Sequence, residues 1–269
     1  MPDRVVAQFR SFAELTILDG ENDPARVIAA CDGYDVLICT LMNKVTADFV
    51  ARLPETIRLV ATYSVGYDHV DVKALEDSGL PLINTPDVLT ETTADFGFAL
   101  LMATARRVTE SEHFLRAGQW TKWSYDLFAG AEVHGSTLGI IGMGRIGQGI
   151  ARRGAYGFGM NVIYHNRSRL SPEAEAECKA SYVSKDELLR TADHVVLVVP
   201  YTPTSHHTIG AAELALMKPS ACLINIARGG IVDDKALAQA LRNRTIAAAG
   251  LDVFEGEPSV TPELLTVPN

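Results

Sequence analysis

The chain has 269 residues, 47% of them hydrophobic, so it is long enough to bury a large core, arranged as two domains. Its formal net charge of −9 gives no support for binding to nucleic acid or to a membrane surface. No apolar run approaches the ~18 residues that a membrane-spanning helix needs, and the N-terminal residues lack a signal-peptide core, so we expect a soluble, cytoplasmic α/β protein.

The first part of the chain alternates short apolar runs with helical patterns. Helices are expected over 4–15, 23–31, 46–53 and 72–78, and strands over 15–18, 36–40, 58–63 and 82–84. We interpret residues 1–87 as a small domain of alternating strands and helices. Ser64, Val65 and Gly66 follow one of these strands, and consecutive small residues there expose main-chain N–H groups that suit a carboxylate. An ordinary turn is the alternative.

A long segment rich in Ala, Leu and Phe, 90–107, is predicted to be a helix that crosses between the domains. Trp120 and Trp123 follow it. We interpret these tryptophans mainly as core or interface residues, and a role in a substrate pocket is the alternative. The four cysteines have no C-x-x-C spacing, so we expect them to be reduced and structural, and we expect no metal site: Cys31, Cys39, Cys178 and Cys222.

The second domain, 88–269, is organised around a glycine-rich turn. Residues 138–141 have the length and composition of a buried parallel strand, and a helix is expected over 148–156. Between them, Gly142, Gly144 and Gly147 form G-x-G-x-x-G around Arg145 and Ile146. The first glycine permits the tight turn, the second lets the main chain approach a pyrophosphate, and the third lets helix and strand pack closely.

The free N–H groups and positive dipole end of that helix suit phosphates, so the motif predicts dinucleotide binding. A glycine-rich turn that only connects a strand to a helix is the alternative. Further strands are expected to begin near residues 161, 194, 221 and 246, with helical stretches between them. Such alternation predicts a parallel sheet.

The end of this domain's second strand indicates which nicotinamide cofactor is used. Enzymes specific for NAD usually place Asp or Glu there to bind the ribose 2′-OH, but no carboxylate occurs between Glu132 and Glu173. The strand is followed instead by a polar and basic run: Asn166, Arg167, Ser168 and Arg169. Because a guanidinium can bind a 2′-phosphate through two hydrogen bonds, we predict a preference for NADP(H) over NAD(H). A solvated basic loop that discriminates little is the alternative.

Two later motifs also follow predicted strands. Arg228 precedes two glycines and could clamp the carboxylate and carbonyl oxygens of an α-keto acid. A surface arginine beside a turn is the alternative. Asp252 and Glu257 follow the next strand, and a buried carboxylate there could raise the pKa of a neighbouring histidine.

Together these features resemble the D-isomer specific 2-hydroxyacid dehydrogenase family, and most closely its glyoxylate/hydroxypyruvate reductase branch, which includes 2-ketogluconate reductases. The resembling segments follow the family's order: 63–71, 84–90, 142–147, 227–230 and 252–258. The resemblance implies two Rossmann-like, doubly wound parallel-sheet domains with the active site in the cleft between them. It also implies hydride transfer from nicotinamide C4 to a small 2-keto acid, giving the D-2-hydroxy acid, and a homodimer formed through the cofactor domain.

The resemblance further implies roles for residues at matching positions. Arg228 would bind the substrate's carboxylate and carbonyl, and Glu257 would orient and charge the catalytic histidine. Amides of Val65 and Gly66 would hold the carboxylate, and Trp123 would reach a neighbouring subunit's pocket. The remaining implied cofactor contacts lie near the nicotinamide or beside the cofactor: Thr93, Pro200, Ala227 and Asp252.

The sequence departs from the family at both ends. None of its seven histidines follows Glu257, although the family's acid/base histidine lies a few residues beyond the stretch that ends here at Asn269. His206 and His207 are the alternatives for a substitute acid. The substrate domain's first strand and last helix are also missing. We therefore expect the natural chain to continue, and we expect this polypeptide to bind cofactor poorly and to have little catalytic activity. A catalytically inactive NADP(H)-binding sensor or scaffold is the alternative.

Overall fold

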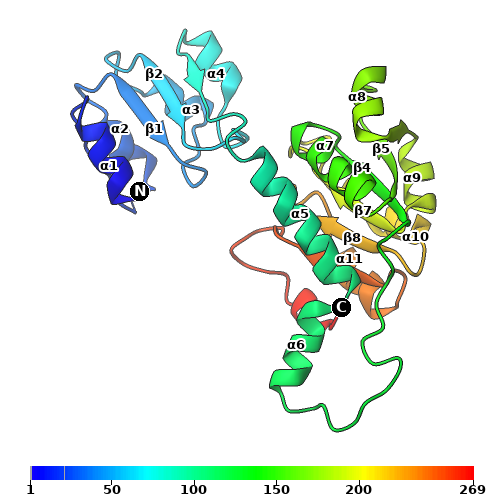
Figure 1. The fold of residues 1–269 in the computed structure, drawn as a ribbon. Helices are drawn as coiled ribbons and strands as arrows, with labels where there is room; N and C mark the ends of the chain where they lie inside the picture. The colour runs from blue at the N-terminus through cyan, green and yellow to red at the C-terminus, as the bar shows by residue number, and fades with distance from the viewer. Residues whose placement is uncertain (1, 21) are drawn as a thin grey trace. The chain divides into compact units, whose positions relative to one another are not determined.

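The computed structural model describes residues 2–20 and 22–269, and it divides into two compact units, Met1–Val88 and Leu89–Asn269. Each unit contains one parallel β-sheet with helices packed against it (Figure 1). The expected α/β class with parallel sheets is therefore confirmed. None of the described helices has the length and apolar character needed to cross a lipid bilayer.

The first unit has a three-stranded sheet in the order β1-β2-β3, formed by Val36–Cys39, Leu59–Thr62 and Leu82–Ile83. Its helices are α1 (Asp3–Arg10), α2 (Pro24–Ala30), α3 (Ala47–Ala51) and α4 (Val72–Asp77). The side chains of Asp23, Thr46 and Asp71 accept hydrogen bonds from main-chain N–H groups at the starts of α2, α3 and α4. Capping of this kind satisfies N–H groups that a helix leaves without partners, which fixes where each helix begins.

Three expectations for this unit are corrected. The helix expected over 4–15 ends at Arg10. The strand expected over 15–18 does not form: these residues have neither helix nor strand structure, and Ile17 and Leu18 are exposed. A short apolar run becomes a strand only where a neighbouring strand can accept its main-chain hydrogen bonds. The strand expected to be buried over 36–40 does form as β1, but only Cys39 in it is buried. Among the described strands β1 pairs with β2 alone, so it lies at the edge of the sheet.

The second unit has a six-stranded parallel sheet in the order β6-β5-β4-β7-β8-β9. The strands are β4 (Thr137–Ile141), β5 (Asn161–His165), β6 (Ala180–Tyr182), β7 (His194–Leu197), β8 (Cys222–Asn225) and β9 (Ala248–Leu251). Five of them begin close to the predicted starts, whereas β6 was not expected because it has only three residues. Numbered within the unit, the order is 3-2-1-4-5-6, the doubly wound order of dinucleotide-binding sheets.

Helices cover both faces of this sheet (Figure 1). On one face, α5 (Thr90–Ala105), α7 (Arg145–Arg152) and α8 (Pro172–Cys178) share a core with the strands that includes Leu101, Leu138 and Ile150. On the other face lie α9 (Lys185–Thr191), α10 (Ala211–Leu216) and α11 (Asp234–Arg242), which contribute Leu188 and Leu237 to a second core. The strand order reverses at β4, between β5 and β7, and ligands bind beyond the carboxyl ends of the strands at such a point.

In the second unit, helix boundaries differ from the expected ones in two places. The helix expected over 148–156 begins earlier, at Arg145, and continues into a π-helical turn, Arg153–Gly157. The helix expected over 90–107 ends at Ala105, because Arg107 adopts a left-handed conformation, with φ of 55°, before α6 (Val108–Arg116) begins. The last short element is a 3₁₀ turn, Leu264–Thr266.

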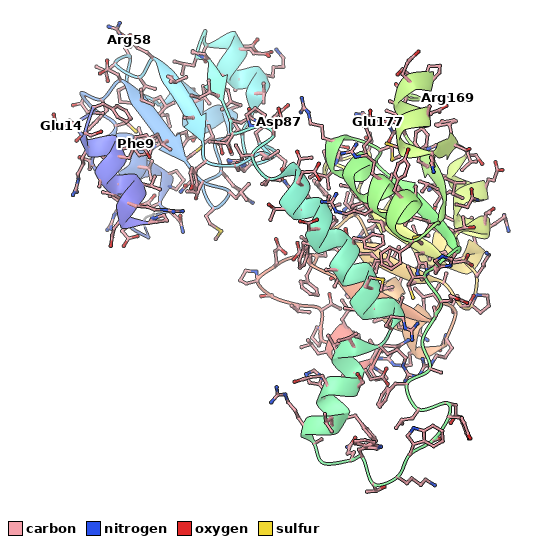
Figure 2. The ribbon with its side chains drawn as sticks, in the orientation of Figure 1. Phe9, Glu14, Arg58, Asp87, Arg169 and Glu177 are labelled. Atoms are coloured by element: carbon pink, nitrogen blue, oxygen red, sulfur yellow. The ribbon has the colours of Figure 1, made fainter. Side chains whose placement is uncertain are left out.

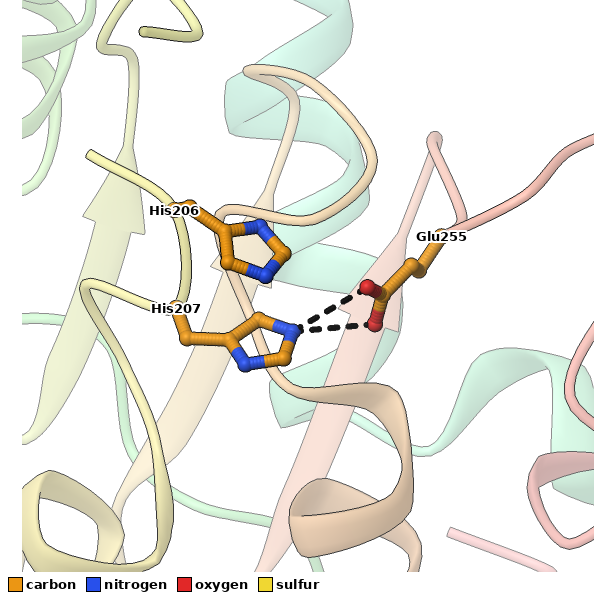
Figure 3. Close-up of side chains that lie close together, drawn as sticks. All are labelled: His206, His207 and Glu255. Atoms are coloured by element: carbon orange, nitrogen blue, oxygen red, sulfur yellow. Dashed lines mark hydrogen bonds and ion pairs between the residues drawn. The ribbon is translucent and has the colours of Figure 1, made fainter. Parts of the chain in front are cut away.

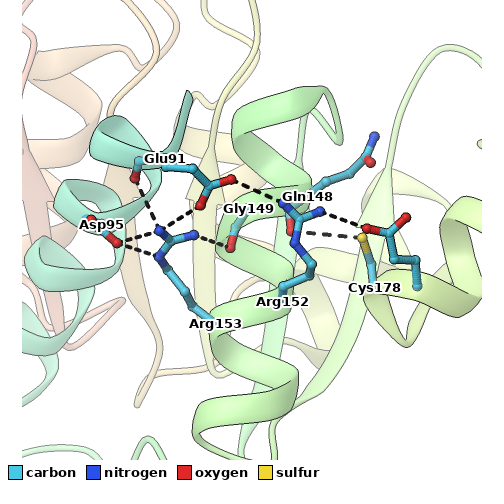
Figure 4. Close-up of polar contacts among 8 residues, drawn as sticks. Glu91, Asp95, Gln148, Gly149, Arg152, Arg153 and Cys178 are labelled. Carbon is cyan, nitrogen blue, oxygen red and sulfur yellow. Dashed lines mark hydrogen bonds and ion pairs between the residues drawn. The ribbon is translucent and has the colours of Figure 1, made fainter. Parts of the chain in front are cut away.

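Ion pairs join α5 to the last residue of α7 and to the π-helical turn that follows it (Figure 4). The Arg153 guanidinium donates to a carboxylate oxygen of Asp95 at 2.8 Å and to one of Glu91 at 2.9 Å. A Cβ atom added to Gly149 would lie 2.8 Å from the Cβ of Ala94, so the two helices are in close contact. The helix that follows the glycine-rich turn is therefore held in place along its length.

Candidate active site

The glycine-rich turn has the geometry that its spacing predicts. Gly142 follows β4 with φ of 105°, and a Cβ added to it would lie 2.4 Å from the carbonyl oxygen of Val198. A Cβ on Gly147 would lie 2.3 Å from the carbonyl oxygen of Gly142. A Cβ on Gly144 would meet no protein atom within 4 Å. The first and third glycines are therefore required by the protein's own packing, whereas the second faces open space at the start of α7.

A pocket of about 460 Å³ lies at the carboxyl ends of β4, β5 and β7. Gly142 and Gly144 line one part of it, and Arg167 and Ser168 line another. The segment after β7 completes the lining with Pro200 and several polar residues. The pocket therefore combines the glycine-rich turn with Arg167 and Ser168, which the sequence analysis assigned to the same cofactor.

Asn166 connects the two sides of this pocket. Its side-chain carbonyl accepts a hydrogen bond from the main-chain N–H of Met143 at 2.7 Å, and the N–H of Gly142 donates to the carbonyl oxygen of His165 at 3.1 Å. The Tyr182 hydroxyl donates to the main-chain carbonyl of Asn166 at 3.2 Å. The end of β5, which carries Arg167 and Ser168, is thus fixed relative to the glycine-rich turn.

Arg169 has a different environment from Arg167. Its guanidinium donates two hydrogen bonds of 2.8 Å to Glu175, and the Tyr164 hydroxyl donates to the same carboxylate at 2.7 Å. These bonds from Arg169 and Tyr164 lower the pKa of Glu175 to about 2. Figure 2 shows Arg169 beside α8, and Arg169 is not among the residues that line the pocket.

Arg228 follows β8 on a tightly built turn. The Asn225 side chain accepts from the N–H of Ala227 at 3.0 Å and donates to the carbonyl of Arg228 at 3.3 Å. A Cβ on Gly229 would lie 1.9 Å from the carbonyl oxygen of Phe254, so only glycine fits there. The Arg228 side chain is half-buried, and one guanidinium nitrogen donates to the carbonyl of Ala227 at 2.7 Å.

Asp252 and Glu257 follow β9, next to β8 in the sheet. The N–H of Asp252 donates to the carbonyl of Asn225 at 3.0 Å. The Glu257 carboxylate accepts from the N–H of Phe254 at 3.1 Å, within its own turn. Asp252 and Glu257 are both exposed, so neither is the buried carboxylate that the sequence analysis considered at this position.

The remaining predicted residues lie as follows. In the first unit, the Ser64 hydroxyl donates to the carbonyl of Gly66 at 2.6 Å and the Asn84 side chain donates to that of Val65 at 2.9 Å, which fixes this loop through its carbonyl oxygens. In the second unit, Thr93 is half-buried near the start of α5, and Ala227 is buried. Trp123 is 65% exposed, with its ring edge-on to that of Tyr125.

Comparison with known families agrees with this geometry. The model of the D-isomer specific 2-hydroxyacid dehydrogenase, NAD binding domain, matches residues 98–269. The chain belongs to the D-isomer specific 2-hydroxyacid dehydrogenase family. It is therefore an oxidoreductase whose second unit contains the family's domain for a nicotinamide cofactor.

Individual members of this dehydrogenase family align over most of the chain. A glyoxylate reductase of Thermococcus gammatolerans is 45% identical over 275 residues, which cover 100% of this chain and 81% of that protein. A glyoxylate/hydroxypyruvate reductase B of Enterobacter agglomerans is 49% identical over 214 residues, covering 79% of this chain and 66% of that protein. The crystal structure of a glyoxylate reductase from Paecilomyes thermophila matches with a TM-score of 0.87 and 34% identity, covering 99% of this chain and 82% of that one.

Sequence reasoning missed much of the pocket lining in this dehydrogenase. The segment after β7 contributes Thr202, Thr204, Ser205 and Thr208, and Lys185 approaches from the start of α9. The signal was the polar run that follows a fully buried strand, where a parallel sheet exposes its carboxyl edge. From that run the sequence analysis selected only Pro200 as a cofactor contact, and it considered His206 and His207 as substitute acids.

Proposed function

We propose that the protein is an NADPH-dependent reductase that transfers a hydride to a small 2-keto acid of the glyoxylate or hydroxypyruvate type, giving the D-2-hydroxy acid. The observation that carries the proposal is the placement of Arg228. It lies on a rigid turn at the carboxyl edge of the same sheet that forms the cofactor pocket. The proposal also rests on the 45% and 49% identity to relatives named glyoxylate reductase and glyoxylate/hydroxypyruvate reductase.

In this mechanism the reduced nicotinamide, when bound, supplies the hydride. Arg228 binds the substrate carboxylate and carbonyl oxygen, and it stabilises the negative charge that develops on that oxygen as the carbonyl carbon is reduced. We assign residues 88–269 to cofactor binding, with Thr93, Ala227 and Asp252 toward the nicotinamide. We assign residues 1–87 to the substrate, with the Val65 and Gly66 amides toward its carboxylate. Glu257 would orient the proton-donating histidine that the family resemblance implies.

The preference for NADPH rests on the second part of the pocket. Arg167 and Ser168 line it at the end of β5, where an NAD-specific enzyme places a carboxylate that would repel a 2′-phosphate. A guanidinium and a hydroxyl offer several donors to that phosphate. We therefore propose that Arg167 and Ser168 select NADP(H).

We further propose a cytoplasmic homodimer that assembles through the cofactor unit. All four cysteines are buried and free, which fits a reducing compartment. The candidate dimer surface, called here the arm, comprises α6 and the connection 117–136, which has neither helix nor strand structure. Its exposed apolar side chains are Val108, Leu115, Trp120, Trp123, Tyr125 and Leu127.

The test is a panel of initial rates with the complete gene product. We expect NADPH oxidation with glyoxylate and with hydroxypyruvate. Arg228→Ala is expected to reduce kcat/KM by about 100-fold or more, the range for loss of a donor to a developing oxyanion. Arg190→Ala, which removes an exposed arginine on α9, is the matched control and is expected to leave the rate unchanged.

Two results would contradict this proposal. An Arg228→Ala variant as active as the wild type would remove its basis. A protein that binds NADPH, yet oxidises it with no keto acid in the panel, would instead be the cofactor-binding sensor or scaffold.

A further inference from the structure

Two adjacent histidines and a glutamate from a separate segment lie close together (Figure 3). His206 and His207 lie between β7 and α10, and Glu255 follows β9. One nitrogen from each imidazole and one oxygen from the carboxylate all lie within 4.8 Å of one another. The His207 Nε2 atom is 3.0 and 3.2 Å from the two oxygens of Glu255.

We propose that His206, His207 and Glu255 form a binding site for a divalent transition-metal cation such as Zn²⁺. Two imidazoles and one carboxylate are a common three-ligand zinc set that leaves a fourth position for water. With metal–ligand bonds of about 2.0 to 2.2 Å, the donor atoms of a tetrahedral site lie roughly 3.3 to 3.5 Å apart. The His207–Glu255 distances of 3.0 and 3.2 Å are slightly shorter than this separation, so that pair has to open a little and His206 has to approach.

The main chain holds the segments that carry these ligands. His207 donates from its N–H to the carbonyl of Gly230 at 2.8 Å, and it has a left-handed φ of 50°. Such a conformation is costly for a residue other than glycine and is enriched at ligand-binding positions. Glu255 donates from its N–H to the buried Asp234 carboxylate at 3.0 Å. The main chain at His207 and at Glu255 is thus held in place before a cation binds.

The surrounding charge also favours a cation. A carboxylate oxygen of Asp233 lies 3.9 Å from Nδ1 of His207, on the opposite side of the ring from Glu255. The side chains of His207 and Glu255 are 34% and 39% exposed, so a cation can reach them and retain a water ligand. The carboxylates of Asp233 and Glu255 thus place negative charge on both sides of His207, which attracts a divalent cation.

The ring geometry shows what must move on binding. The His206 and His207 rings are stacked with centroids 3.8 Å apart and planes 23° from parallel, so their in-plane lone pairs do not yet converge. His206 is exposed, and its Nδ1 lies 3.2 Å from the Tyr201 hydroxyl. A rotation of the His206 side chain, exchanging that contact for the metal, completes the site.

This site lies outside the hydride-transfer chemistry proposed above. A cation in it would cross-link the segment after β7, which lines the cofactor pocket, to the turn that follows β9. The sequence analysis expected no metal site from the spacing of the cysteines, and it did not consider Glu255, which is 48 residues from His207. The fold alone brings them together.

The experiment is a calorimetric titration of the metal-free, untagged protein with ZnCl₂, repeated with Co²⁺ to record its visible ligand-field spectrum. We expect one bound equivalent and tetrahedral Co²⁺ bands. His206→Ala, His207→Asn and Glu255→Gln should each weaken binding by at least the ~10-fold that loss of a mere outer-shell partner costs. Asparagine tolerates the left-handed conformation of residue 207.

His113→Ala is the matched control, because His113 is also an exposed histidine beside a glutamate, with Glu112 at 3.9 Å. It should bind Zn²⁺ as the wild type does. His206→Ala alters only an exposed side chain, so its Zn²⁺ affinity tests the proposal even if the other variants fold poorly. Wild-type protein that takes up no more Zn²⁺ than His206→Ala would overturn the proposal, whatever its activity with keto acids.

Discussion

Arg167 and Arg169 flank the same serine, and in the sequence they are equivalent candidates for a phosphate ligand. Their neighbours in the fold separate them. Arg167 lines the proposed cofactor pocket, whereas Arg169 is bound through two hydrogen bonds to Glu175, whose charge Tyr164 also stabilises. An arginine whose fork of donors is already directed at a carboxylate has fewer donors to offer a ligand. The two residues should therefore respond differently to mutation.

Arg167→Ala should weaken binding of NADPH by roughly 10-fold or more, because a charge-assisted contact to a phosphate contributes about 1.5 to 3 kcal/mol. Binding of NADH should change little, since NADH lacks the 2′-phosphate. Arg169→Ala serves as the matched control and should affect NADPH less than Arg167→Ala does. Fluorescence titrations with both cofactors measure these constants. Equal losses for NADPH and NADH in Arg167→Ala would refute the assignment to the 2′-phosphate.

At the scale of elements, the β4–turn–α7 unit shows why the three glycines are not equivalent. A side chain at residue 147 would collide with the carbonyl of Gly142, so strand and helix could not close on each other. A side chain at residue 144 would collide with nothing in the protein, although this residue lines the cofactor pocket. The third glycine is thus required for packing, and the second leaves open space in the proposed cofactor pocket.

Gly144→Ala and Gly147→Ala should therefore give opposite results. Gly147→Ala should destabilise the fold by about 1 to 3 kcal/mol, the usual cost of overpacking. Gly144→Ala should leave the melting temperature of the cofactor-free protein nearly unchanged, because φ of −76° and ψ of −164° suit alanine, but it should weaken cofactor binding. Thermal unfolding with and without NADPH separates the two effects. A Gly144→Ala variant that binds NADPH as tightly as the wild type would show that the pyrophosphate lies elsewhere.

Elements with strong local signals were predictable from sequence, and those that depend on neighbours were not. The run 138–141 followed by three glycines specifies its own strand and turn. The three-residue strand β6 forms because β5 offers it an edge, and residues 15–18 remain irregular among the described residues for lack of one.

The same distinction holds for the candidate site. Arg228 and Asp252 could be placed at one sheet edge from sequence, because parallel strands end on the same side. The pairing of Arg169 with Glu175 could not, since both residues look solvent-exposed in the sequence. Nor could the contact of His207 with Glu255, which requires the segments after β7 and β9 to meet in space.

At the scale of the whole molecule, the structure of a single chain does not explain why the arm exposes several apolar side chains. Its base is held by the edge-on contact of Phe114 with Phe128, whose rings are 5.1 Å apart, and by the Arg107 guanidinium 5.0 Å over Phe128. Beyond that base, Trp120, Trp123 and Tyr125 remain exposed. A firmly anchored segment that presents aromatic side chains is typical of a protein–protein interface rather than of a flexible loop.

A homodimer formed through the arm should be broken by charge at its centre. The double variant Leu115→Glu/Trp123→Glu should convert a particle with the mass of two chains into one with the mass of a single chain, because it buries uncompensated carboxylates at the interface. Phe12→Glu, which charges an equally exposed aromatic residue in the first unit, should remain dimeric. Light scattering coupled to size-exclusion chromatography measures the masses. A wild-type protein that is monomeric at micromolar concentration would contradict the homodimer. A double variant that stays dimeric would place the dimer interface outside the arm.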